Sequence, residues 1–375
     1  MPTTHRTKVA FIGTGIMGAP IAGHILDAGY DLTVNNRTKS KAEGLLAKGA
    51  HWADTPAQAA ANADVVFTML GYPADVEDVY LSTDGLVRAA KKGAYLVDLT
   101  TSSAQLAKDI HDACEVEDKH AFDCPVTGGD TGAKAGTLTL IVGAKESYAA
   151  PVLPILQTFS DKIYYMGGAG KGQTAKLCNQ VSLAACMVGY ADAMALAEQG
   201  GLDVAQTLDM VSHGMGGSVA MERLAPKSLN GDYKPGFLVE HLRKDLGLAL
   251  AQAEDTDITL PGADTAYTLY DMLYQIGGAR LGTQAISLLY QDEATCTAAG
   301  LDWSKLDVED LANEDEKDDK DGHCCGGHGG DGCRGGPRGG AGSGGGPGEA
   351  PGGDGCCGGH HHEDGHCCHH HGDGE

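Results

Sequence analysis

Six residues near the start of the chain have the spacing of a loop that binds a dinucleotide phosphate. This G-x-G-x-x-G pattern consists of Gly13, Thr14, Gly15, Ile16, Met17 and Gly18. Residues 8–13 read as a short buried strand, and a helical pattern runs from about residue 16 to residue 28. In this context Gly13 permits the tight turn, Gly15 lets the backbone approach a pyrophosphate, and Gly18 lets the helix pack on the sheet. The helix N-terminus then stabilises the phosphate charge; an ordinary glycine-rich turn is the structural alternative.

The residues after the next predicted strand, residues 31–35, indicate which dinucleotide is bound. That strand is followed by Asn36-Arg37-Thr38-Lys39-Ser40-Lys41. An NAD site usually has a carboxylate about 20 residues beyond the loop to accept the ribose hydroxyls, and none is present there. The side chains of Arg37, Thr38 and Lys41, next to Asn36, could hold a 2′-phosphate instead. We therefore expect NADP(H) to be preferred, with NAD(H) possible; the alternative is a solvated basic turn.

Strand and helix patterns alternate along the first half of the chain. Further strands are predicted at residues 64–70 and 95–99 and around residues 137–142. The alternation predicts an α/β domain with a doubly wound parallel sheet, a Rossmann domain over residues 1–166. Beyond residue 165 only helical patterns follow, which predicts an all-helical domain over residues 167–301. These patterns cover residues 173–199, 203–213, 239–253, 263–277 and 284–289.

The composition changes beyond residue 301. Residues 302–375 contain 17 acidic residues, 5 basic residues and 7 of the 12 cysteines, in an acidic run and then a glycine-rich segment. Such a segment cannot bury enough apolar surface to offset its ordering entropy, so a disordered, low-complexity tail is predicted. Its thiol and imidazole groups are potential ligands for Zn, Ni or Cu. The candidate ligands are His323, Cys324, Cys325, Cys356, Cys357, His366, Cys367 and Cys368. Adjacent cysteines do not match a zinc finger, so we expect loose binding at several sites, or only incidental affinity.

The charge balance excludes some classes of function. The formal net charge is -24, whereas nucleic acids and anionic membranes require a basic surface. We find no apolar run of about 18 residues and no signal-peptide core at the N-terminus. The other five cysteines are scattered, which suits a reducing compartment. We therefore expect a soluble, cytoplasmic protein that binds neither nucleic acid nor membrane.

Further motifs follow the glycine loop in a fixed order along residues 8–295. They are Asn36-Arg37-Thr38, Thr68-Met69-Leu70, Asp98-Leu99-Thr100-Thr101, Asp123-Cys124-Pro125-Val126-Thr127-Gly128-Gly129, Gly168-x-Gly170 leading to Lys176 and Asn179-Gln180, and Phe237 with Lys244-Asp245-Leu246. With these motifs the chain resembles the β-hydroxyacid dehydrogenase family, which includes 3-hydroxyisobutyrate dehydrogenase and several semialdehyde reductases. It departs from the family pattern at four positions, none of which removes a charge that the chemistry needs. These positions are His24 for Asn, Cys124 for Ala, Thr127 for Ser and Gln180 for Asn.

The resemblance implies that Lys176 is the catalytic acid/base. Reduction of an aldehyde needs a proton on oxygen, and a lysine can supply it and stabilise the developing alkoxide. Burial beside a cofactor would lower the pKa of this lysine toward the working pH. One helical turn further on, Asn179 and Gln180 could hydrogen-bond the substrate. Without the resemblance, a surface lysine would be the alternative.

The resemblance also implies the remaining site residues. Thr127, Gly128 and Gly129 would hold the substrate carboxylate, because glycines let a turn present several N–H groups to an anion. The family's cofactor contacts fall on Met69, Leu70, Thr101, Phe237 and Lys244. His213 and His241 receive no catalytic role, because a lone helical histidine is usually structural or solvated.

Together these motifs predict an NADP(H)-dependent oxidoreductase that interconverts a small β-hydroxyacid and its semialdehyde. The family implies a homodimer or homotetramer. Three alternatives stay open: a non-catalytic NADP-binding module, a metal-handling protein that uses the tail, and an enzyme like 6-phosphogluconate dehydrogenase. The last has His-Asn-Gly after its lysine, whereas this chain has Asn179-Gln180-Val181.

Overall fold

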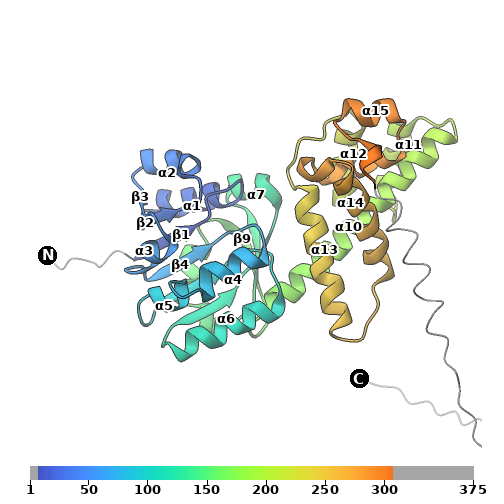
Figure 1. The fold of residues 1–375 in the computed structure, drawn as a ribbon. Helices are drawn as coiled ribbons and strands as arrows, with labels where there is room; N and C mark the ends of the chain where they lie inside the picture. The colour runs from blue at the N-terminus through green and yellow to red at the C-terminus, as the bar shows by residue number, and fades with distance from the viewer. Residues whose placement is uncertain (1–6, 307–375) are drawn as a thin grey trace, which may run out of the picture. The chain divides into compact units, whose positions relative to one another are not determined.

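The computed structural model describes residues 7–306, and these form an α/β part followed by a helical part (Figure 1). The main sheet has the strand order β3-β2-β1-β4-β5-β6, and every pair is parallel. Its strands are β1 (Lys8–Ile12), β2 (Asp31–Asn35), β3 (His51–Trp52), β4 (Val65–Thr68), β5 (Tyr95–Asp98) and β6 (His120–Asp123). The predicted doubly wound sheet is confirmed. Residues 307–375, with the predicted disorder and the candidate metal ligands from His323 to Cys368, lie outside the described residues. Residues 302–306, at the start of the predicted tail, are described and contain a 3-10 segment at Trp303–Lys305.

Helices connect the parallel strands of the main sheet. They are α1 (Gly18–Asp27), η1 (Lys39–Ala42), α2 (Glu43–Ala47), α3 (Pro56–Ala60), α4 (Pro73–Leu81), α5 (Leu86–Ala89) and α6 (Ala104–Val116). Two of their starts have clear chemical causes. The Thr55 side chain accepts a hydrogen bond from the Gln58 N–H at the start of α3, and Ser103 caps the Leu106 N–H of α6. These caps satisfy amide groups that lack a partner within the helix.

A second sheet has three strands, β7 (Val126–Thr127), β8 (Leu138–Val142) and β9 (Ser160–Tyr165). Strand β7 pairs antiparallel with β8, and β8 pairs parallel with β9. The helices α7 (Gly129–Ala135), α8 (Glu146–Ala149) and α9 (Leu153–Leu156) lie between these strands in the chain. The strand predicted around residues 137–142 therefore exists, but it belongs to this second sheet.

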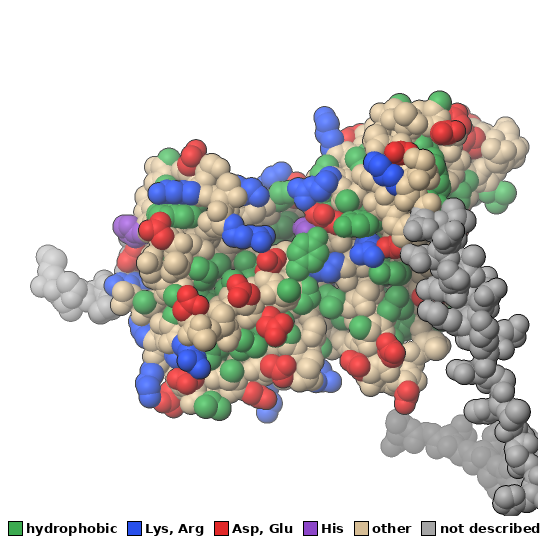
Figure 2. Space-filling view, in the orientation of Figure 1, with side chains coloured by type: hydrophobic (Ala, Val, Ile, Leu, Met, Phe, Trp, Pro, Cys, Tyr) green, Lys and Arg blue, Asp and Glu red, His purple; other side chains and the backbone are tan. Residues whose placement is uncertain are grey.

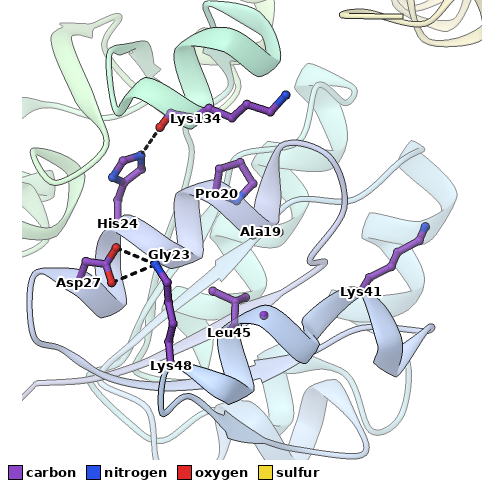
Figure 3. A pocket seen from close by; sticks show the side chains of 10 residues that line it. Ala19, Pro20, Gly23, His24, Asp27, Lys41, Leu45, Lys48 and Lys134 are labelled. Atoms are coloured by element: carbon purple, nitrogen blue, oxygen red, sulfur yellow. Dashed lines mark hydrogen bonds and ion pairs between the residues drawn. The ribbon is translucent and has the colours of Figure 1, made fainter.

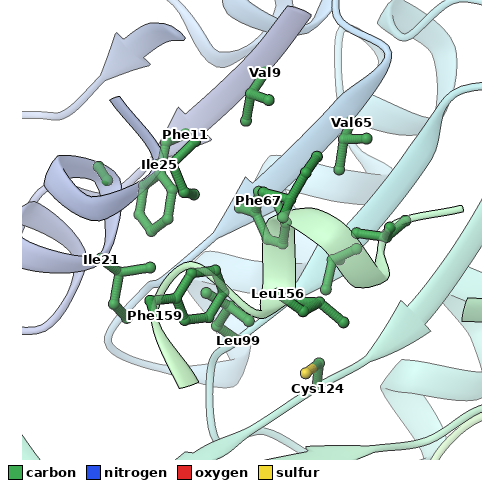
Figure 4. Packing of buried hydrophobic residues seen from close by; sticks show 14 of the residues in the cluster. Val9, Phe11, Ile21, Ile25, Val65, Phe67, Leu99, Cys124, Leu156 and Phe159 are labelled. Carbon is green, nitrogen blue, oxygen red and sulfur yellow. The ribbon is translucent and has the colours of Figure 1, made fainter. Parts of the chain in front are cut away.

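Apolar side chains cover both faces of the main sheet. Successive residues of β1 alternate, so Val9 and Phe11 join one buried cluster while Ala10 and Ile12 join another. In the first cluster, shown in Figure 4, the ring centroids of Phe11 and Phe67 are 6.1 Å apart. Strands buried on both faces are continuous apolar runs, which is why β1 and β4 were predictable from the sequence.

The helical part is built around one long helix. Its helices are α10 (Lys171–Gln199), α11 (Val204–Ser212), α12 (Val219–Leu229), α13 (Val239–Glu254), α14 (Pro261–Gln275) and α15 (Glu293–Ala298), with the short 3-10 segments η2 (Gly278–Arg280), η3 (Thr283–Tyr290) and η4 (Trp303–Lys305). Helix α10 contacts each helix from α11 to α14. Within the described residues, only α10 has the length and mean hydropathy, 1.3, to cross a membrane. This is a weak indication, because core helices of soluble proteins meet the same criteria.

A buried hydrogen-bond network joins the carboxyl ends of β4 and β5. The Thr68 hydroxyl donates to Asp98 Oδ1 over 2.8 Å, and the Thr100 N–H donates to the same oxygen over 3.0 Å. The Thr100 hydroxyl in turn accepts from the Leu70 N–H at 2.9 Å. These bonds fix the two loops that follow β4 and β5, where the ligands of an open parallel sheet bind.

Burial raises the pKa of Asp98 to about 6 from its ordinary 3.8, although hydrogen bonds from Thr100 and Thr68 oppose the shift. A carboxyl group with a raised folded-state pKa stabilises the fold below its ordinary pKa, and this contribution is lost as the pH rises through the folded-state value. Between pH 4 and pH 7 we expect the free energy of unfolding of the wild type to fall by up to about 3 kcal/mol relative to that of Asp98→Asn.

Urea unfolding of both proteins across this pH range measures the difference. Asp161→Asn, at an exposed position on β9, is the control and should keep the wild-type dependence on pH. A difference in the free energy of unfolding between the wild type and Asp98→Asn that is the same at all pH values would contradict the prediction.

Candidate functional site

The glycine loop between β1 and α1 leaves space at one position only. A Cβ at Gly13 would lie 2.2 Å from Met69 O, and one at Gly18 would lie 1.9 Å from Gly13 O. At Gly15 a Cβ would meet no atom within 4 Å. Packing therefore requires the outer two glycines, whereas Gly15 borders open space. This is the arrangement in which a pyrophosphate can approach the backbone.

Two buried hydroxyls in loops at the carboxyl edge of the main sheet lack hydrogen-bond partners within residues 7–306. They are Thr14 Oγ1, in the glycine loop, and Ser102 Oγ, in the loop after β5. Buried polar atoms are nearly always bonded, so an unbonded pair near the carboxyl edge of the sheet points to a polar ligand. The residues present thus fit a dinucleotide.

The predicted 2′-phosphate residues have different environments. The Asn36 side chain is engaged within the protein: its Oδ1 accepts from the Thr14 N–H at 3.0 Å, and its Nδ2 donates to Thr38 O at 2.8 Å. The Arg37 side chain is 88% exposed and forms an ion pair with Asp75 at 3.2 Å. The Asn36 side chain therefore stabilises the loop, while the exposed guanidinium of Arg37 can bind a phosphate. The other basic residue of this group, Lys41, lies on η1 and lines the cavity in Figure 3.

His24, which departs from the family pattern, joins α1 to α7. Its Nε2 lies 3.1 Å from both Ala133 O and Lys134 O, so this nitrogen must carry the proton and donate. Figure 3 shows the contact with Lys134. A Cβ at Gly136 would lie 3.1 Å from the imidazole. His24 therefore links the helix of the cofactor loop to the helix that begins at Gly129.

Lys176 is a buried lysine in the second turn of α10. Its exposed fraction is 7%. Its pKa is lowered to about 8, chiefly by burial; the nearby Asp245 raises this pKa and Lys244 lowers it. No hydrogen bond or ion pair holds its amine within residues 7–306. A lysine with these properties can exchange a proton near neutral pH.

Polar residues of α10 and α13 form a network beside Lys176. Gln180 Nε2 donates to Asp245 Oδ2 at 2.6 Å, and Asn179 Nδ2 donates to Gln180 Oε1 at 2.9 Å. Both ends of the Gln180 amide are therefore occupied, and Asp245 is held in place. The sequence motifs predict no site role for Asp245; the signal that points to it is its place beside Lys244.

Lys244 connects this network to the sheet. Its Nζ donates to Thr101 O over 2.5 Å and lies 2.9 Å from Asp245 Oδ1. Thr101 follows β5, and Met69 and Leu70 follow β4, so these three predicted cofactor contacts lie at one edge of the main sheet. Phe237 is partly buried and packs against the helical core, with its ring centroid 6.5 Å from that of His241.

The predicted carboxylate loop has a backbone that glycine favours. Gly128 has φ of 133° and Gly129 has φ of 64°, immediately after Thr127 at the end of β7. A glycine turn of this kind after a strand can present backbone N–H groups to an anion. Within residues 7–306, no group of three His, Cys, Asp or Glu side chains is arranged to hold a metal ion.

The glycine geometry leads to a test of the cofactor loop. Gly15→Ala should fold with wild-type stability, because its Cβ has space, but should weaken NADPH binding more than about tenfold by obstructing the pyrophosphate. Gly18→Ala should unfold at a markedly lower temperature because of its backbone clash. Gly44→Ala, in α2 and equally unobstructed, is the control. Fluorescence titration with NADPH and thermal unfolding measure both effects; undiminished NADPH affinity in Gly15→Ala would contradict the assignment.

Family comparisons agree with this architecture. Residues 8–167 match the NAD-binding domain of 6-phosphogluconate dehydrogenase. Residues 170–290 match the family described as NAD-binding of NADP-dependent 3-hydroxyisobutyrate dehydrogenase.

Individual relatives cover the same part of the chain. An uncharacterized oxidoreductase of Bacillus subtilis is 45% identical over 285 residues, which are 76% of this chain and 99% of the relative. A probable 3-hydroxyisobutyrate dehydrogenase-like protein of Arabidopsis thaliana is 41% identical over 287 residues, 76% of this chain and 86% of the relative. The structure of Mycobacterium tuberculosis 3-hydroxyisobutyrate dehydrogenase with L-serine superposes with a TM-score of 0.71 at 33% identity, covering 76% of this chain and all of that one. The chain belongs to the β-hydroxyacid dehydrogenase family of NAD(P)-dependent oxidoreductases, which act on a CH–OH group.

Proposed function

We propose that this protein uses NADP(H) to interconvert a small β-hydroxyacid and its semialdehyde, with Lys176 as the general acid/base. The observation that carries the proposal is the buried amine of Lys176, whose pKa is lowered to about 8. It lies on the helix that is joined through Asp245 and Lys244 to the loop after β5. An amine that titrates near neutral pH can act in both directions of the reaction.

NADP(H), when bound, accepts or supplies the hydride. The loop of residues 13–18 would hold its pyrophosphate, and Asn36, Arg37, Thr38 and Lys41 would surround its 2′-phosphate. Met69, Leu70, Thr101, Phe237 and Lys244 would line its nicotinamide end. The preference for NADP(H) is supported by the exposed guanidinium of Arg37 and by the match to a family described as NADP-dependent.

The substrate would be held at its two ends. Thr127, Gly128 and Gly129 would bind the carboxylate, and Asn179 would orient the chain of the substrate. Lys176 would move the proton at the substrate oxygen. The ammonium form would donate it in the reductive direction, and the amine form would accept it in the oxidative direction.

The relatives support this choice of substrate class. Both 3-hydroxyisobutyrate and L-serine, named with the M. tuberculosis enzyme, have a carboxylate and a hydroxyl on the β-carbon. One anion site and one acid/base therefore suffice for either compound. The side group at the α-carbon distinguishes them, and few contacts decide between such substrates.

The alternatives have less support. A 6-phosphogluconate dehydrogenase is disfavoured because the match over residues 170–290 is to the 3-hydroxyisobutyrate enzyme. A non-catalytic module would not need a buried lysine with a lowered pKa. Nothing in the described residues supports metal handling as the main role. On the face in Figure 2 acidic and basic side chains are interspersed, so that face offers no continuous basic surface for nucleic acid.

We also propose the roles of the two parts of the chain, its oligomeric state and its location. Residues 1–166 would bind the cofactor, and residues 167–301 would complete the substrate side. The helical part would form a homodimer or homotetramer, which its exposed apolar side chains, among them Leu196, Met210 and Val219, support. A cytoplasmic location is supported by the five cysteines of the described residues, which are free thiols.

Lys176→Ala tests the catalytic role. We expect kcat for aldehyde reduction to fall by about 10²–10⁴-fold, with NADPH affinity nearly unchanged. Methylmalonate, tartronate and succinic semialdehydes and glyoxylate form the substrate panel. In the wild type the reductive rate should fall as the pH rises through about 8 because the ammonium form is lost, and the oxidative rate should rise over the same range.

Lys171→Ala, an exposed lysine on the same helix, is the matched control and should keep the wild-type rate. A nearly wild-type rate in Lys176→Ala would reject the proposed role of Lys176.

The ion pair between Arg37 and Asp75 gives a test of cofactor preference. Arg37→Ala should weaken NADPH binding and leave NADH binding nearly unchanged, because only NADPH has the 2′-phosphate. Asp75→Asn should strengthen NADPH binding by a few-fold, because the guanidinium no longer has a competing carboxylate. Fluorescence titrations with both cofactors measure the effects, and equal losses for both in Arg37→Ala would reject the assignment.

A further inference from the structure

The side chain of Gln173 bridges α10 and the loop after β5. Gln173 is fully buried, and both ends of its amide are bonded: Nε2 donates to Thr100 O at 2.7 Å, and Oε1 accepts from the Ser102 N–H at 2.9 Å. These two backbone groups lie on either side of Thr101, whose carbonyl oxygen accepts from Lys244. One side chain therefore fixes the loop on both sides of the residue that α13 contacts.

Asp123, at the end of β6, also holds the first turn of α10. Its Oδ1 accepts from the Gly170 N–H at 2.8 Å, and its Oδ2 accepts from the Gln173 N–H at 2.7 Å. A Cβ at Gly143 would lie 2.0 Å from this carboxylate, and one at Gly172 would lie 2.7 Å from it. Glycines thus make room for a buried acid at the helix N-terminus, where negative charge is favourable.

Gln173 lies three residues before Lys176 on α10, and both side chains are buried. Side chains at this spacing lie on the same face of a helix. The loop that Gln173 holds is at the carboxyl edge of the sheet, where the dinucleotide binds in this fold. The fixed turn therefore sets how far Lys176 lies from that loop.

We propose that Gln173 is a positioning residue for the reaction, because its amide fixes the position of the loop of residues 100–102 relative to the helix that carries Lys176. The inference rests on the proposed function of Lys176. Gln173 itself need not touch substrate or cofactor. The site then depends on a residue whose amide has no role in proton transfer.

Gln173→Met tests the bridge, because methionine has a similar length and neither donates nor accepts as the amide does. We expect kcat to fall about 10- to 100-fold, since a displacement near 1 Å can cost that much, while the Kd for NADPH changes less than about twofold. Water that reaches Lys176 would also raise its pKa, so the pH at which the reductive rate falls should move upward from about 8.

Gln206→Met is the matched control in the full-length protein. Gln206 is also the third residue of its helix, and its N–H is also held by an aspartate, Asp203, at 2.9 Å, but its side chain is exposed. Its kcat should stay within about twofold of the wild-type value, and its reductive rate should fall at the same pH as that of the wild type. A Gln173→Met protein that matches this control in both readouts overturns the proposal.

Gln173→Glu keeps the test decisive if the methionine variant folds poorly. Its carboxylate can accept from Ser102 but cannot donate to Thr100 O, whereas its protonated form can do both. We expect the ratio of kcat in Gln173→Glu to kcat in Gln173→Met to rise as the pH falls. Loss of NADPH binding and of cooperative unfolding in both variants, without this recovery, would show a purely structural role and overturn the proposal.

Lys176→Ala, measured in parallel, separates the two proposals. A wild-type rate in Lys176→Ala rejects the proposed function. A large loss there, combined with an unchanged Gln173→Met, rejects only the role of Gln173.

Discussion

The placement of one buried carboxylate determines how the two parts of the described chain meet. Asp123 ends the last strand of the main sheet and accepts hydrogen bonds from the first turn of α10. Burial raises the pKa of this carboxyl group, while the N–H groups of Gly170 and Gln173 oppose the shift. A buried charge is tolerated only where such partners exist. The carboxylate at the end of β6 therefore depends on the N–H groups at the start of α10. This junction fixes the start of α10 at Gln173, three residues before Lys176.

The site next to this junction combines groups that oppose one another electrostatically. Lys176 is buried and close to a second lysine, and both conditions disfavour its charged form; Asp245 favours it. As a result the pKa of the Lys176 amine is about 8, so that both the charged and the neutral form are available near this pH. Because Gln180 and Lys244 hold Asp245, small displacements of α13 would change the acidity of Lys176. The network is thus part of the chemistry, although only Lys176 moves a proton in the proposed reaction.

Three of the four departures from the family pattern, at His24, Cys124 and Gln180, have defined environments within the protein. His24 reaches two carbonyl groups of α7 from α1, so it makes the connection between the cofactor helix and the carboxylate loop. Cys124 is fully buried in the apolar cluster of the first sheet face, and burial raises the pKa of its thiol. It is therefore an inert core residue. Gln180 uses both ends of its amide within the protein, which an asparagine, one methylene shorter, would do with different geometry.

The sequence alone determined the elements whose signals are local. Short-range patterning predicts the apolar runs of β1 and β4, the glycine loop and the long helix over residues 173–199. The resemblance to the family also rests on short motifs. Very short strands such as β3 and β7 have two residues each, too few for a pattern, and β6 was missed although it completes the sheet. The partnership of Gln173 with Thr100 and Ser102, and of Asp123 with Gly170, joins residues about 50 to 70 positions apart. Only the tertiary structure could decide these contacts, because hydrogen bonds between distant segments leave no periodic signal in one sequence.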